Sequence, residues 1–182
     1  MTTLQSVSRI LRPPPRPLEA TITAAHWAAL ARALGAEFPT DFRRFVEAYG
    51  TGTISRFIAI ANPFSEADPF FPWFMSVLAA DKNCLLHTGS GVAGGLPPFP
   101  APGGLLPFGR WADWGVLYFQ TRGVPDGWPI VFTDVHGNDH GSFDMSLFTF
   151  LEQVLRGKLR SPIFGVEYPR HEKAKFVPGA TR

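Results

Sequence analysis

Apolar residues recur at helical spacing near the start of the chain. Between residues 23 and 35 they follow the pattern i, i+3, i+4 and i+7, at Trp27, Leu30, Ala31 and Leu34. Thr23 can cap the amino end of such a helix, and Gly35 follows its last apolar position. The pattern therefore predicts a helix over residues 24–34.

Two more helices are predicted before residue 90. The first begins near Pro39 and ends at Gly50, with one apolar face formed by Phe42, Phe45, Val46 and Tyr49. The second spans residues 72–86, where the apolar positions are Trp73, Val77, Leu78, Leu85 and Leu86. Between them, residues 53–60 alternate apolar and polar side chains, which predicts a single strand.

Strand patterns dominate the second half of the chain. Strands are expected at residues 104–108, 115–121 and 128–133, with turns at 110–113 and 123–127. Links this short favour antiparallel pairing. Residues 146–156 then form an amphipathic helix, capped by Asp144 or Ser142 and closed by Gly157.

The order of these elements lacks a regular alternation of strand and helix, so it predicts an α+β fold. We expect a single domain in which an antiparallel or mixed sheet of about four to six strands packs with amino-terminal helices and a carboxy-terminal helix. A length of 182 residues with 45% hydrophobic residues suits one domain with a sizeable core.

Glycine and proline mark the segments outside this core. Residues 1–19 include Pro13, Pro14, Pro15 and Pro17, so they are expected to form a flexible, extended lead-in. Residues 89–104 hold six glycines and four prolines, which predicts a long loop. The domain is therefore expected over 20–160, followed by a basic extension at 161–182.

Charge is distributed unevenly along the chain. Residues 51–155 carry four basic and nine acidic side chains, a net charge of −5, whereas residues 156–182 carry seven basic and two acidic ones, a net charge of +5. An acidic centre disfavours nucleic acid and suits a basic protein. Cys84 is the only cysteine, which excludes an internal disulfide. With no apolar run of membrane-spanning or signal-peptide type, we expect a cytoplasmic protein with no membrane partner.

Several of these segments, taken in order, resemble the SUKH superfamily, which includes the yeast cell-wall-synthesis regulator and many bacterial members. The first part of the resemblance is residues 38–45, ending at Tyr49-Gly50. The second part comprises residues 105–109, 115–119 and 126–131, Phe143, and residues 150–157. Together these cover about residues 20–165.

The resemblance implies a non-enzymatic immunity protein, without a cofactor, that binds and neutralises a cognate bacterial polymorphic toxin, frequently a nuclease. An acidic inhibitor could then occupy a basic substrate groove as a phosphate mimic. The eukaryotic relatives suggest an alternative, a protein-interaction adaptor without a toxin partner, which would use the basic tail at 156–182.

Tryptophans beside acidic residues at predicted strand ends are candidates for partner binding, because aromatic anchors with flanking charge resemble interface hot spots. The candidate residues are Trp111, Asp113, Trp114, Asp126 and Trp128. The alternative is that at least two of the three tryptophans belong to the core.

A rival enzymatic interpretation rests on residues 134–140, which contain Asp134, His136, Asp139 and His140. Imidazoles and carboxylates can bind a divalent metal, so this cluster could belong to a metal-dependent hydrolase. The rest of the chain offers no second acid-histidine motif to complete such a site. Gly137-Asn138-Asp139 also has the composition of a plain polar turn.

Overall fold

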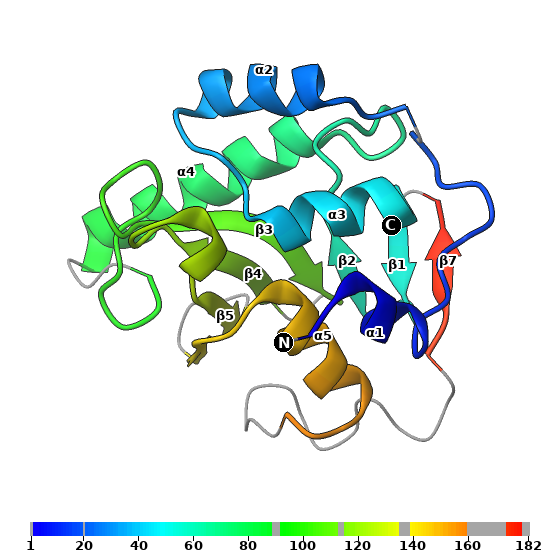
Figure 1. The fold of residues 1–182 in the computed structure, drawn as a ribbon. Coiled ribbons are helices and arrows are strands. Elements are labelled where there is room, and N and C mark those ends of the chain that lie inside the picture. The colour runs from blue at the N-terminus through cyan, green and yellow to red at the C-terminus, as the bar shows by residue number, and fades with distance from the viewer. Residues whose placement is uncertain are drawn as a thin grey trace.

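The chain folds into helices and one sheet, in a computed structural model that describes residues 2–19, 21–88, 92–112, 115–134, 139–159 and 174–179. The helices are α1 Leu4–Ser8, α2 Ala24–Leu34, α3 Thr40–Tyr49, α4 Phe70–Thr88 and α5 Leu147–Leu155, with a 3-10 turn, η1, at Pro125–Gly127. The strands are β1 Gly52–Ile54, β2 Ile58–Ile60, β3 Leu105–Trp111, β4 Gly115–Gln120, β5 Ile130–Asp134, β6 His140–Phe143 and β7 Phe176–Pro178 (Figure 1). The molecule is a single α+β domain, as predicted.

Short connections make the sheet an antiparallel meander. Its strand order is β6-β5-β4-β3-β2-β1-β7, and each neighbouring pair of strands is antiparallel. The described residues thus form seven strands, more than the four to six expected. Two of the additional strands are the short β6 and β7. The third arises because the single strand predicted over 53–60 forms two strands, β1 and β2.

The single strand predicted over 53–60 is wrong, because the chain reverses in its middle. Ser55 and Arg56 have φ angles of 49° and 62°, in the left-handed region, and β1 then pairs with β2 from Ile54 to Ile58. Ser55 fits a polar position of a half-exposed strand, but Arg56 falls on the same face as Ile54 and Ile58, and this break in the alternation marks the turn.

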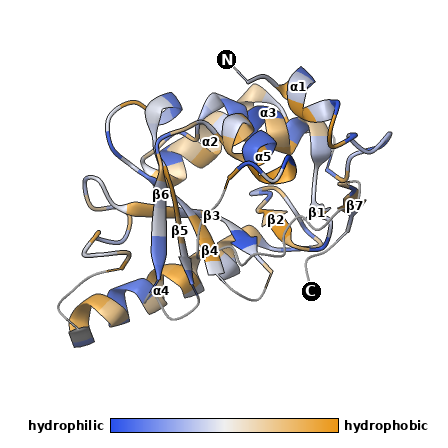
Figure 2. Cartoon of the chain, turned by 90° about the horizontal axis from the view of Figure 1, so that it is seen from below, coloured by the Kyte–Doolittle hydropathy of each residue, from blue (hydrophilic) through white to orange (hydrophobic). Residues whose placement is uncertain are grey.

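Helices cover both faces of the sheet. Successive residues of β4 and β5 point to opposite faces, so Leu117 and Phe119 join the main core while Tyr118 joins a smaller cluster. The main core also receives apolar side chains from α1, α3 and α5. Figure 2 shows α4 on the opposite side of the sheet from α3 and α5. The smaller cluster packs against Val77 and Cys84 of α4.

The predicted helix boundaries agree closely with the structure. Thr23 is the N-cap of α2, and Gly35 ends it with a φ of 72°. The third helix is longer than residues 72–86, since α4 begins at Phe70. Ser146 caps α5 by accepting a hydrogen bond from the Thr149 amide at 3.4 Å, so the expected caps Asp144 and Ser142 are wrong.

The extended lead-in expected over residues 1–19 is wrong for its first part, which contains α1. Val7 and Leu11 are fully buried, and the Tyr49 hydroxyl donates to the Leu11 carbonyl at 2.6 Å. The apolar side chains of this segment complete the core beside α3 and α5. Figure 1 shows the amino terminus lying beside α5.

A polar cluster fixes the end of the same segment. Oε2 of Glu19 accepts hydrogen bonds from Thr51 Oγ1 at 2.5 Å and from Asn62 Nδ2 at 3.2 Å. Thr51 and Asn62 are both buried, so the carboxylate satisfies polar groups that water does not reach. The proline-rich stretch is therefore anchored at both ends.

The basic carboxy-terminal extension returns to the domain over part of its length. Its residues 176–178 form β7, which pairs with β1 so that Phe176 lies opposite Ile54. The ring of Phe176 contacts Tyr49 at a centroid distance of 5.2 Å. Residues 160–173 and 180–182 lie outside the described part of the chain. Among the helices that are described, none combines the length and apolar character needed to cross a membrane.

We expect Leu11→Ala to lower the free energy of unfolding by about 2–4 kcal/mol, because it opens a cavity beneath α1. Leu18→Ala, at an exposed position of the same segment, provides the matched control and should change it by less than about 1 kcal/mol. Urea unfolding measures both values. Equal effects of the two substitutions would contradict the docking of the amino terminus.

Candidate functional site

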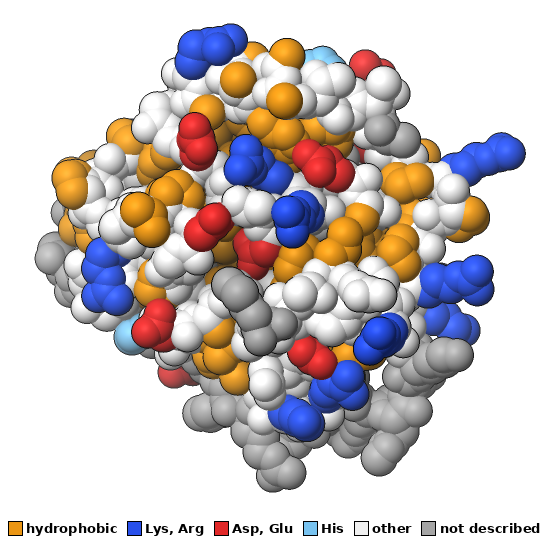
Figure 3. Space-filling view, viewed as in Figure 1, with side chains coloured by type: hydrophobic (Ala, Val, Ile, Leu, Met, Phe, Trp, Pro, Cys, Tyr) orange, Lys and Arg blue, Asp and Glu red, His pale blue; other side chains and the backbone are white. Residues whose placement is uncertain are grey.

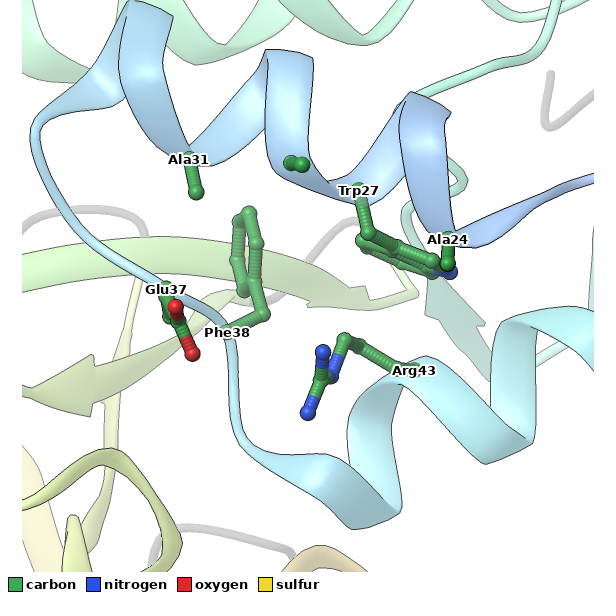
Figure 4. Close-up of a pocket in the computed structure, with 7 residues that line it drawn as sticks. Ala24, Trp27, Ala31, Glu37, Phe38 and Arg43 are labelled. Atoms are coloured by element: carbon green, nitrogen blue, oxygen red, sulfur yellow. The ribbon is translucent and has the colours of Figure 1, made fainter.

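A small pocket lies between α2 and α3 (Figure 4). Its volume is about 120 Å³, and its lining residues are Ala24, Trp27, Ala28, Ala31, Glu37, Phe38 and Arg43. The three alanines are spaced i, i+4 and i+7, so they share one face of α2, and their small side chains leave the space open. Figure 3 shows apolar atoms between α2 and α3, bordered by charged side chains of both signs.

Two aromatic side chains form fixed walls of the pocket. Trp27 is buried, and its indole Nε1 donates to Glu47 Oε1 at 2.8 Å. Phe38 stacks on Phe42 at a centroid distance of 4.6 Å and meets Trp27 edge to face at 6.3 Å. Because these rings are held by the core beneath them, the pocket is largely pre-formed.

Arg43 brings a positive charge to this apolar surface. Figure 4 shows its side chain extending from α3 toward Trp27 and Phe38. The side chain is half-buried, and its Nη2 lies 3.4 Å from Thr40 Oγ1, a long hydrogen bond. Its Nε is buried without a hydrogen-bond partner, and no carboxylate of the described residues forms an ion pair with it. A guanidinium that is partly desolvated and unpaired is energetically costly.

Asp126, one of the predicted partner-binding residues, has an internal role beside this pocket. Its carboxylate accepts hydrogen bonds from the Thr40 amide at 2.6 Å and from the Thr40 hydroxyl at 3.0 Å. The N-cap residue of α3 is Pro39, whose side chain cannot cap a helix. Asp126 of η1 therefore supplies the cap and holds Thr40, which in turn contacts Arg43.

The other predicted site residues are not brought together on a surface. Trp111 is 3% exposed and packs edge to face on Phe132, while Trp128 is 6% exposed and donates from Nε1 to the Gly123 carbonyl at 3.2 Å. Neither indole offers an exposed face to a partner, which corrects their proposed use as surface anchors. Asp113 and Trp114 lie outside the described residues.

The segments that resemble the SUKH superfamily lie in α3, β3, β4, η1, β5, β6 and α5. Comparison with protein-family models, curated proteins and solved structures finds no match for this chain. The SUKH relationship therefore stays a prediction.

Many of the acidic residues between 51 and 155 that the structure describes are not free on the surface. Among the described ones, Asp134 and four others make internal contacts or are buried. Asp68 pairs with Arg110 at 3.0 Å, Asp126 caps α3, Glu152 pairs with Arg156 at 3.0 Å, and Asp81 is buried. The net charge of residues 51–155 thus overstates the acidity of the surface.

Strands β5 and β6 flank the predicted metal cluster. Asp134 ends β5, and its Oδ1 accepts a hydrogen bond from the Asp139 amide at 3.3 Å, next to His140 at the start of β6. His136 and the rest of residues 135–138 lie outside the described part of the chain. In the part that is described, no three acidic, histidine or cysteine side chains are grouped closely enough to hold a metal ion.

Beneath α4, Asp81 is a buried titratable group that sequence reasoning missed. Its Oδ1 accepts a hydrogen bond from the Tyr118 hydroxyl at 3.2 Å, and its Oδ2 has no partner. Burial raises the pKa of Asp81 to about 6, and the bond from Tyr118 opposes the shift only in part. The side chain is therefore a proton-binding group of the folded state near neutral pH.

We expect the free energy of unfolding to fall as the pH rises from about 4 to about 7. The contribution of Asp81 to this fall is up to about 3 kcal/mol. The folded state binds this proton more tightly than the unfolded state, so the stabilising contribution is lost as the pH passes through the raised pKa. Asp81→Asn should remove that part of the slope, and Asp144→Asn, at an exposed position, should not. Denaturant unfolding at several pH values measures the slope, and an unchanged slope in Asp81→Asn would contradict the assignment.

We further expect Asp126→Ala to destabilise the isolated protein by about 1 kcal/mol, because the amino end of α3 loses its cap. The substitution Asp139→Ala, at another exposed acidic position, is a suitable comparison, and thermal unfolding without any partner measures both. A neutral result for Asp126→Ala would exclude the capping role.

Proposed function

We propose that this chain is a SUKH-like immunity protein, which binds and neutralises a cognate protein toxin in the cytoplasm and has no enzymatic activity of its own. The resemblance of residues 38–50 and 105–157 to the SUKH superfamily supports a protein toxin as the partner. The α+β fold is compatible with it. The observation that supports a protein partner most directly lies on α4.

One exposed stripe of α4 is apolar. Phe71, Met75 and Leu86 are 42%, 58% and 78% exposed, and their spacing of i, i+4 and i+15 places them on the same side of the helix. Ala79 and Lys82 share this side. A second exposed side of α4 is polar and carries Ser76, Asn83 and His87. The exposed surface of this helix is thus divided into an apolar stripe and a polar one.

Large apolar side chains concentrated on one exposed helix face indicate a surface that a protein covers. An exposed apolar helix face can enter a groove on a partner, and methionine adapts well to a partner's shape. Lys82 lies within the stripe, so the complementary surface would be apolar with an acidic residue. This surface, rather than the central acidic residues, supports binding of a protein toxin.

The proposal is tested by using the chain as bait in the lysate and secreted fraction of its source organism, with mass spectrometry of the captured proteins. We expect a secreted toxin, whose activity is lost on binding and whose toxicity in growing cells is relieved by co-expression of this chain. Tight capture of a cellular protein that is not a toxin would instead favour the adaptor. Failure to capture any specific protein would contradict both.

Met75→Glu should weaken binding of the captured toxin by about 30-fold, because it places a charge within the apolar contact. Asn83→Glu adds the same charge on the polar side of α4 and should leave the affinity nearly unchanged. Calorimetry with the purified toxin measures the two dissociation constants. Equal weakening by both substitutions would place the contact elsewhere.

A further inference from the structure

The pocket between α2 and α3 has the size of a site for one side chain. Its volume of about 120 Å³ is well below the roughly 300–1,000 Å³ of sites that enclose a whole cofactor or drug-sized ligand. It is also open at the surface, between two helices whose neighbouring residues Ala25, Ala29 and Arg44 are exposed. A group that projects from another protein would fit this shape.

The lining defines the chemistry of that group. The exposed alanines Ala24 and Ala28 of α2 offer apolar contact to a short hydrocarbon stem, above the buried rings of Trp27 and Phe38. Arg43 offers a guanidinium that has no carboxylate partner among the described residues. A planar carboxylate at the end of the stem would supply the missing counter-charge, because guanidinium and carboxylate groups match in geometry.

Glu37 restricts the charge that the pocket accepts. It lies beside Phe38 on the connection between α2 and α3, and its side chain is exposed (Figure 4). A phosphate group carries up to two negative charges at neutral pH and would be repelled more strongly by Glu37 than a single carboxylate. A neutral amide would leave Arg43 unpaired.

From these features we infer that the α2–α3 pocket receives the side chain of an aspartate or glutamate from the partner protein. The carboxylate pairs with Arg43, and the methylene stem lies against Ala24 and Ala28 of α2. Only the source of the carboxylate rests on the proposed function, since the chemistry of the pocket is independent of the partner's identity.

The chemistry is tested with N-acetyl-glutamate N-methylamide as the probe and its glutamine counterpart as the neutral control. The indole N–H of Trp27 reports binding by two-dimensional NMR, and its signal is assigned with Trp27→Phe. A probe of about a dozen heavy atoms should bind with a dissociation constant of about 1 mM at ordinary ligand efficiency. The glutamine probe and inorganic phosphate should shift the signal at least tenfold less at equal concentration.

Two substitutions locate the site. Arg43→Gln removes the counter-charge, and Ala28→Leu fills the pocket while keeping a good helix former on α2. Each should abolish the response to the glutamate probe. Arg44→Gln, at the exposed neighbouring position, should leave it intact. Equal binding of the acid and amide probes, or an equal loss in Arg44→Gln, would overturn the inference.

The partner provides the second arm of the experiment. With the captured toxin, Arg43→Gln and Ala28→Leu should each weaken binding by at least tenfold. If the probe binds but neither substitution affects the toxin, the pocket serves a free carboxylic acid and the inference fails while the proposed function stands. If the probe binds and no toxin is captured, the proposed function fails. The assignment of a toxin side chain as the occupant of the pocket then fails with it.

Discussion

The packing of Phe42 against the sheet is the interaction on which the candidate site depends. Phe108 and Phe119 stack at 3.9 Å on the sheet, and Phe42 of α3 meets Phe119 edge to face at 5.8 Å. On its other side Phe42 stacks with Phe38, which contacts Trp27 of α2. One continuous series of aromatic rings thus connects the sheet to both walls of the pocket. Burial of these rings, each with a large apolar area, fixes the pocket geometry as part of core formation.

Polar contacts at the start of α3 complement this packing. Oδ1 of Asp41 accepts a hydrogen bond from the backbone amide of Phe42 at 2.8 Å. Its Oδ2 accepts one from the backbone amide of Phe148 in α5 at 3.2 Å. Burial raises the pKa of Asp41, although these amide donors act in the opposite direction. Asp126 provides the remaining cap through Thr40. The amino end of α3 is therefore joined to α5 and to η1, and Arg43 lies within one helical turn of this junction.

The sequence was informative where a long apolar pattern agreed with its capping residues. The helix at 24–34 is predictable for that reason, whereas the helix at 146–156 and the three central strands are predictable from their apolar patterns, since the expected caps Asp144 and Ser142 are wrong. The hairpin at Ser55-Arg56 has only one weak sign in the sequence, the polar Arg56 on the face of Ile54 and Ile58. The pattern of β6 is weak because His140–Phe143 is short and half polar. For tryptophan, composition alone does not distinguish a core ring from an exposed anchor. One sequence pattern indicates the pocket: three alanines at i, i+4 and i+7 lie on the same face of α2 as its tryptophan.

The distribution of charge also decides how such a protein could inhibit a nuclease toxin. Phosphate mimicry requires exposed carboxylates in a group, and Asp68, Asp81 and Glu152 contribute little to one because they make internal contacts or are buried. Glu66, Asp139 and Asp144 stay exposed. The two candidate contact surfaces each combine apolar side chains with a cation, Arg43 in the pocket and Lys82 on α4. A substrate groove that binds nucleic acid is basic and would repel both cations. Under the proposed function, these two surfaces suit an apolar and acidic part of the toxin outside the groove, and a contact there would inhibit through blocked access or a fixed toxin conformation.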